Sequence, residues 1–163
     1  MSVIPQSVYR LVERRLKQRW ELEARARAKL YDAQQAALSL ASPGANPDEG
    51  HASGPGNRTQ AMALLILEAE EQVAQAEKWA EAIRLTDLAF PWESTSEGVI
   101  AGYLYGNGMN IQETCIATGK SRGAVQHLRD NYVAHCALFA ASLGLIKIRE
   151  ERGDHEDQSV DHP

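Results

Sequence analysis

The sequence predicts an all-α protein, and three observations carry that prediction. Alanine-rich runs and other strong helix formers dominate the 163 residues, with only three Trp, five Tyr and two Phe. Apolar residues recur at steps of three and four over long stretches, which is the period of an amphipathic helix. Gly and Pro gather between those stretches, where helices end. We expect a long N-terminal helix or helices, a flexible linker and a second helical region.

Residues 1–41 are expected to form a basic helical segment. Its apolar stripe repeats at steps of four and three from Leu22 to Leu40, and Val8, Val12 and Leu16 extend it toward the N-terminus. The polar face is basic and includes the candidate phosphate contacts Arg10, Arg14 and Lys17. Two interpretations of this face stay open, a solvated helix surface and an arm that touches DNA phosphates.

Residues 42–58 are expected to form a flexible linker. They contain three Pro and four Gly, and no aliphatic side chain larger than Ala. Such a segment cannot bury enough apolar surface to offset the entropy lost on ordering.

Residues 59–148 are expected to form a helical domain that opens with a helix over 59–89, capped by Thr59. Small apolar residues from Ile66 to Ile83 recur at alternating steps of three and four, a narrow seam that favours close helix packing within the chain or between chains. Pro91 and Trp92 follow the end of this helix, because proline cannot continue it.

Three shorter helices are predicted next, over 97–105, 111–118 and 122–145. Ser94 with Glu97 and Asn110 with Glu113 read as two capping boxes. Gly119 suits the left-handed residue that closes a helix, and Ser121 caps the helix after it. Residues 149–163 are acidic and almost free of large apolar residues, so a disordered tail is expected there.

The last of these helices begins with an unusual surface, made of Arg122, Gly123, Gln126 and His127. It is too small and polar for packing, and too sparsely charged for a merely solvated face. A helix that enters the major groove after a tight turn needs such a leading end, because Arg can pair with guanine and Gln with adenine. The predicted DNA-binding residues are Lys120, Ser121, Arg122, Gly123, Gln126, His127 and Arg129. A helical hairpin without a DNA role is the alternative.

The formal net charge of -5 hides four alternating segments. Residues 1–30 hold 8 Lys and Arg against 3 Asp and Glu, residues 31–98 hold 3 against 11, residues 99–149 hold 5 against 2, and residues 150–163 hold 1 against 6. DNA responds to the local potential, so this acidic average does not exclude DNA binding.

The stretch "NIQETCIATGKSRGAVQHLR" (110–129) resembles the helix-turn-helix in the last conserved region of bacterial sigma factors. The matching positions are Asn110, Gln112, Glu113, Cys115, Gly119, Ser121, Arg122 and Val125. Residues 6–146 as a whole are similar to the phage-encoded RinA/ArpU family of late-gene transcriptional regulators, through "NRTQAMAL", "KWAEAIRLTDLAF" and a closing "SLGL". The chain departs from the sigma pattern at five positions. Thr114, Thr118 and Lys120 stand where the pattern has large apolar residues. Gly123 replaces a polar reading residue, and Asp130 adds a negative charge near the phosphates.

The resemblance implies a prophage-encoded activator of late genes that binds double-stranded DNA as a homo-oligomer and contacts host RNA polymerase. A phage terminase small subunit and a helical adaptor that does not bind DNA are the alternatives. No catalytic triad, paired carboxylates or cofactor fingerprint stands out, and Cys115 and Cys136 read as small buried residues, so we expect no enzyme, metal or cofactor. No signal peptide or membrane span is evident, and a cytoplasmic protein is expected.

Overall fold

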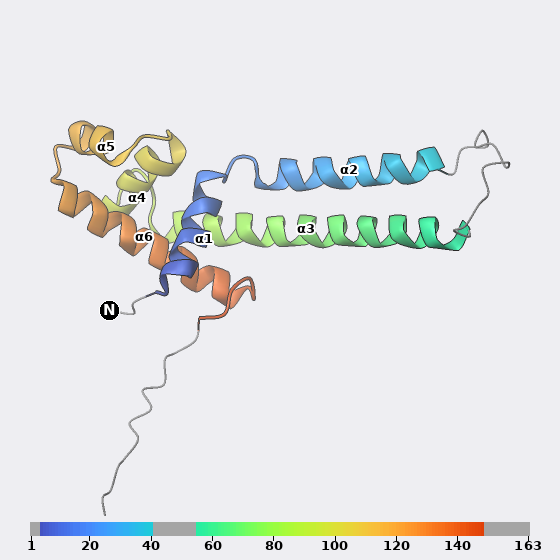
Figure 1. Cartoon of the computed structure of the whole chain (residues 1–163). Coiled ribbons are helices and arrows are strands. Elements are labelled where there is room, and N and C mark those ends of the chain that lie inside the picture. Colours follow the sequence, from blue (N-terminus) through green and yellow to red (C-terminus); the bar gives the residue numbers. More distant parts are fainter. Residues whose placement is uncertain (1–3, 41–54, 149–163) are drawn as a thin grey trace, which may run out of the picture.

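All regular structure is helical in the part of the chain that the computed structural model describes, residues 4–40 and 55–148 (Figure 1). This confirms the predicted all-α class. The elements are α1 (Gln6–Lys17), α2 (Leu22–Leu40), α3 (Pro55–Ala89), α4 (Ser96–Ala101), the π-helical turn η1 (Gly102–Gly106), α5 (Ile111–Thr118) and α6 (Arg122–Ser142). None of the described helices combines the length and the apolar character that crossing a membrane requires.

The helices form two parts, which we call the arm and the head. The arm is α2 packed antiparallel against residues 55–78 of α3, and it projects from the head (Figure 1). An exposed ion pair of 3.5 Å between Arg27 Nη2 and Glu77 Oε1 joins the two helices near the base of the arm. The head holds the other helices and the last turns of α3 around a core whose largest fully buried side chains are Tyr132, Leu16, Ile100, Val12, Val125 and Val133.

The apolar stripe predicted for residues 1–41 is divided between two helices, which pack against different parts of the molecule. In α1, Val12 and Leu16 are fully buried in the head, whereas Leu22 and Ala26 of α2 face α3. The chain turns between them, and Arg19 in that turn forms an ion pair with Asp87 of α3. Helices from both sides of the predicted linker therefore share one hydrophobic core.

Helix α3 begins at Pro55, so the predicted cap at Thr59 and the predicted linker boundary at 58 are wrong. Proline is favoured in the first turn of a helix, where its missing N–H costs nothing, and this explains the earlier start. The remainder of the predicted linker, residues 42–54, lies outside the described residues. The small-residue seam packs within the chain, because Ala69 and Ala76 are buried against α2.

The cap of α4 is Thr95, so the predicted capping box of Ser94 and Glu97 is wrong by one residue. Thr95 Oγ1 accepts the N–H of Gly98 at 3.0 Å and donates to the carbonyl oxygen of Pro91 at 3.0 Å. The helix starts so close to the preceding turn that a Cβ on Gly98 would stand 2.3 Å from the Pro91 oxygen. The close approach of Gly98 to the backbone of Pro91 therefore sets the start of α4.

Helix α6 ends at Ser142, three residues before the predicted end at 145, because Gly144 adopts a left-handed conformation with φ of 76°. Its buried face includes Val125, Tyr132 and Cys136, as the sequence predicts, while His135 is exposed. The predicted tail, residues 149–163, lies outside the described residues.

Candidate nucleic-acid interface

The candidate interface begins with α5, whose first turn carries the predicted capping box. Asn110 Oδ1 accepts the backbone N–H of Glu113 at 2.9 Å, and Glu113 Oε2 accepts the N–H of Asn110 at 2.8 Å. Both halves of the box are present, which confirms the prediction. The box fixes the start of α5 at Ile111, shortly after η1 ends at Gly106.

Two threonines of α5, Thr114 and Thr118, satisfy their hydroxyl groups within the helix. Thr114 is fully buried and donates to the carbonyl oxygen of Asn110 at 2.9 Å. Thr118 donates to the carbonyl oxygen of Thr114 at 2.7 Å. Because each hydroxyl bonds one turn back, the methyl groups can pack without leaving a buried polar group unpaired. Thr114 and Thr118 are therefore compatible with close packing of α5 on α6.

A three-residue turn joins α5 to α6. Gly119 closes α5 with φ of 66° and ψ of 17°, the left-handed conformation that the sequence predicts. Ser121 caps α6 by accepting the N–H of Ala124 at 3.2 Å, which is also as predicted. Lys120, between them, is exposed.

The leading end of α6 is open to solvent. Arg122, Gly123 and His127 are exposed and Gln126 is half-buried. A Cβ on Gly123 would meet nothing within 4 Å. Within the described residues, neither Arg122 nor Gln126 bonds another side chain, and His127 only approaches Asn131, at 3.5 Å. Their polar groups are therefore available to an outside partner.

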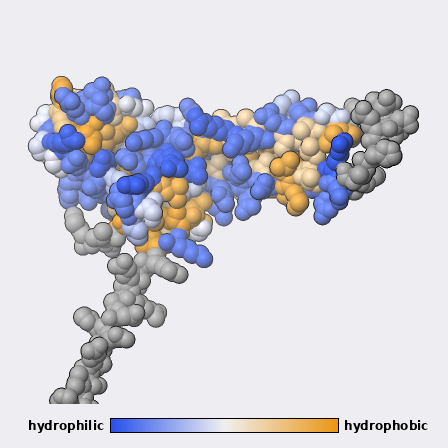
Figure 2. Space-filling view, in the orientation of Figure 1, coloured by the Kyte–Doolittle hydropathy of each residue, from blue (hydrophilic) through white to orange (hydrophobic). Residues whose placement is uncertain are grey.

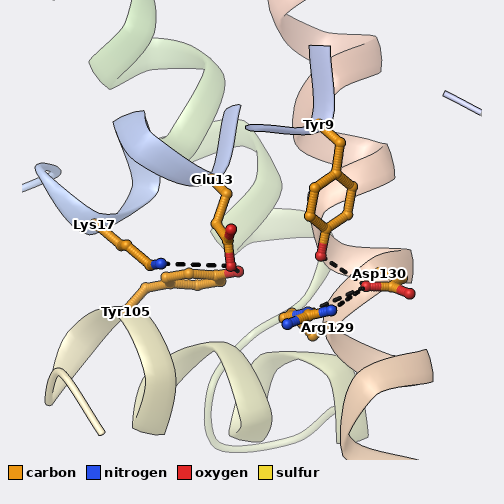
Figure 3. A network of polar contacts seen from close by, with 6 residues as sticks. All are labelled: Tyr9, Glu13, Lys17, Tyr105, Arg129 and Asp130. Atoms are coloured by element: carbon orange, nitrogen blue, oxygen red, sulfur yellow. Dashed lines mark hydrogen bonds and ion pairs between the residues drawn. The ribbon is translucent and has the colours of Figure 1, made fainter. Parts of the chain in front are cut away.

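Arg129 differs from the other predicted DNA-binding residues, because it lies in a network of polar contacts between α6 and α1 (Figure 3). Its side chain is only 20% exposed, and its Nη2 and Nε lie 3.0 and 3.1 Å from Asp130 Oδ1. The guanidinium also stands 5.7 Å from the ring centre of Tyr9. Burial lowers the pKa of Arg129, but Tyr9 and Asp130 raise that pKa overall. The side chain is thus engaged inside the head.

The same network ties the N-terminal helix to α6. Tyr9 Oη donates to Asp130 Oδ1 at 2.7 Å, although 121 positions separate the two residues in the sequence. Burial, with this hydrogen bond, raises the pKa of Tyr9 far above its ordinary value, so the phenol stays a donor. The carboxylate of Asp130 therefore accepts hydrogen bonds from both Arg129 and Tyr9.

The three predicted phosphate contacts line one exposed side of α1. Arg10 and Arg14 have no side-chain partner among the described residues. Lys17 lies 3.7 Å from Glu13, whose other contact is the hydroxyl group of Tyr105 at 3.4 Å (Figure 3). Burial and the nearby Glu13 raise the pKa of Tyr105. The network thus joins α1 and α6 in one body but leaves these cations on its surface.

A second polar cluster, which sequence reasoning missed, joins the turn between α1 and α2 to α3 and α6 at the base of the arm. Asp87 of α3 accepts hydrogen bonds from Tyr132 of α6 and from Trp92 Nε1, the latter at 3.0 Å, and it pairs with Arg19. The Arg19 guanidinium also lies 4.8 Å from the ring centre of Trp92. Arg19 and Tyr132 lie 68 and 45 positions from Asp87, so no local pattern could have revealed that these three residues meet.

Two further findings bear on the interface. Among the residues that the structure describes, no group of three or more His, Cys, Asp or Glu is placed to hold a metal ion. No family model, curated protein or solved structure matches the chain. What the protein does is therefore inferred from its own residues.

Proposed function

We propose that the protein is a sequence-specific DNA-binding transcription regulator that places the leading end of α6 in the major groove of double-stranded DNA. The observation that carries this proposal is the open, polar first turn of α6, which follows a glycine-closed turn and is backed by α5. A groove about 12 Å wide admits a helix whose leading end is polar and uncluttered.

Each residue of that turn suits a role. Arg122 can donate two hydrogen bonds to a guanine, and Gln126 can form a pair of hydrogen bonds with an adenine. Gly123, with open space around it, lets the backbone come close to the base edges. Ser121 and Lys120, at the turn, suit contacts with the phosphates.

The polar network suggests different roles for the remaining predicted residues. Arg129 bonds Asp130 and stacks on Tyr9, so we assign it to positioning α1 against α6 rather than to reading a base. Arg10, Arg14 and Lys17 remain candidate phosphate contacts, because they are exposed on a helix that the network anchors to α6.

The biological setting of the proposal comes from the resemblance to late-gene regulators encoded by phages. It includes activation of late genes in a phage or prophage, contact with host RNA polymerase and action as a homo-oligomer. The exposed glutamates of α3, among them Glu70 and Glu71, offer an acidic surface for the polymerase.

A phage terminase small subunit, which recognises DNA for packaging, is the second candidate. The arm favours it, because a long helical hairpin with exposed leucines is suited to building an oligomer. The two candidates differ in what they would assemble. A closed ring that stimulates a packaging ATPase supports the terminase, and a dimer that protects a short site beside a promoter supports the regulator.

The reading helix can be tested after a preferred site has been selected from random double-stranded oligonucleotides. Arg122→Ala and Gln126→Ala should each weaken binding to that site by about 1–3 kcal/mol and relax the preference at one position. Arg14→Ala and Lys17→Ala should instead weaken binding to all sequences alike, and each should reduce the salt dependence by roughly one unit of slope. Lys78→Ala, an exposed cation of the arm, serves as the control.

Two results would contradict the proposal. One is the failure of the folded protein to select any sequence. The other is a site whose affinity and preference survive both Arg122→Ala and Gln126→Ala. In either case the adaptor without a DNA role becomes the leading interpretation.

A further inference from the structure

One side of the arm carries a groove of about 640 Å³ at its base. Leu22, Ala26, Ala76 and Trp79 form its apolar floor. Arg15 of α1 lies at its inner end. The polar and cationic side chains around its rim are Arg15, Gln18, Arg25, Lys29, Gln72 and Gln75. An apolar floor inside a cationic rim suits a partner that brings an apolar ridge flanked by carboxylates.

The tip of the arm, on the same side, has the opposite character. Leu65 lies seven and fourteen residues before Gln72 and Trp79, so the three residues follow one line along α3. Glu68 lies seven residues before Gln75 in the same way. Leu65 is 50% exposed, and Figure 2 shows hydrophobic side chains over the outer part of the arm. The groove at the base therefore continues into an apolar ridge that carries a carboxylate.

Helix α2 repeats this division of charge. Arg25 and Lys29 line the groove, and Asp32, seven residues after Arg25, follows them toward the tip. Arg25 pairs with Glu21 within its own helix, an exposed contact that contributes little. Lys29, Asp32 and Glu68 have no partner among the described residues. One side of the arm is thus cationic at the base and anionic at the tip.

These features are complementary about a single point. The midpoint between Leu65 and Trp79 falls at position 72 of α3, and the midpoint between Lys29 and Asp32 falls between positions 30 and 31 of α2. Arg27 pairs with Glu77 across the two helices, and Lys29 and Gln72 both line the groove, so the two midpoints lie at a similar height along the arm. A two-fold axis through this height would bring each tip onto the other copy's groove.

We propose that this side of the arm binds a second copy of the chain, with the two arms antiparallel. Leu65 of each copy then covers the Trp79 floor of the other, Glu68 meets Arg25, and Asp32 meets Lys29. The inference deepens the homo-oligomer of the proposed function and rests on that part of it, whereas DNA reading by α6 can hold or fail separately. A two-fold interface of this kind closes on itself and yields a dimer.

Charge reversal tests the pairing with the full chain. Arg25→Glu and Glu68→Arg should each raise the dimer dissociation constant on the order of 100-fold, because every dimer then contains two like-charge contacts. Mixing the two variants should restore dimers at wild-type strength, since one of each chain recreates both opposite-charge pairs. Sedimentation velocity measures both effects, and circular dichroism checks that the variants stay folded. Glu70→Arg, an exposed site on another side of α3, is the matched control.

The outcomes separate clearly. Dimers of the wild type and of Glu70→Arg, monomers of each single variant and dimers of the mixture support the proposal. A wild type that stays monomeric at about 100 μM overturns it. So does an oligomer that neither reversal affects more than Glu70→Arg does, and so does a mixture that stays monomeric. None of these measurements uses DNA, so failure here leaves the test of Arg122 and Gln126 intact.

Discussion

The head and the arm are built from similar helices but place their apolar side chains differently. In the head, Leu16, Ile100 and Tyr132 are fully buried between helices that come from distant parts of the sequence. In the arm, alanines such as Ala26 and Ala69 are buried where α2 meets α3, and the leucines toward the tip are exposed. Leu16 is 0% exposed, whereas Leu64 is 59% exposed.

The difference shows what each part needs to be stable. Helices that meet around large side chains supply their own core, whereas two helices joined through alanines bury little apolar area per turn. The head can therefore fold without outside help, and we expect the arm to gain most from a partner. The polar clusters follow the same division, because those that join distant stretches lie in the head.

The largest effect expected is on matched leucines of the two parts. Leu16→Ala should lower the free energy of unfolding by about 2–5 kcal/mol, because it leaves a cavity in the head. Leu64→Ala should change it by no more than about 0.5 kcal/mol at a concentration where the chain is monomeric. Urea denaturation measures both, and equal losses would remove the distinction between head and arm.

A smaller effect is expected on glycines in packed and open places. Gly98→Ala should destabilise the head by about 1–3 kcal/mol, since the new Cβ would stand 2.3 Å from the Pro91 oxygen and the backbone would have to shift. Gly123→Ala should stabilise α6 by up to about 1 kcal/mol, because that position is open and alanine favours helix. Thermal unfolding of the two variants should therefore move in opposite directions.

The smallest effect is a pH dependence that belongs to the head. Burial raises the pKa of the Cys136 thiol from 9.0 to about 11. The thiol therefore ionises more readily in the unfolded chain, and its contribution to stability is complete below pH 9 and is lost as the pH rises toward 11. At pH 10 this loss should be about 1 kcal/mol.

The measurement is the unfolding free energy at pH 7 and at pH 10, for the wild type and for Cys136→Ala. The variant should lose less stability between the two pH values. An identical loss in both proteins would show that ionisation of this thiol does not contribute.

The sequence was sufficient wherever a structure is decided by neighbouring residues. The box of Asn110 and Glu113, the left-handed Gly119 and the cap at Ser121 all depend on hydrogen bonds within four positions, and all three were predicted. The sequence pattern does not predict the helix starts at Thr95 and Pro55. A nearby turn shifts the first, and a proline in the first turn of α3 shifts the second. Arg129 was predicted as a DNA contact because nothing near it in sequence indicates that Tyr9 covers it.

By itself, then, the sequence determined the helical class, the period of each stripe and the polar leading end of α6, because helix propensity, capping and hydrophobic spacing act over a few residues. Only the tertiary structure decided that the stripe of residues 1–41 divides between α1 in the head and α2 in the arm. It also decided that the small-residue seam closes within one chain, and that Asp87 gathers Arg19, Trp92 and Tyr132. These choices depend on which apolar surfaces find one another and on which buried charges can be paired, and both are settled between residues tens of positions apart.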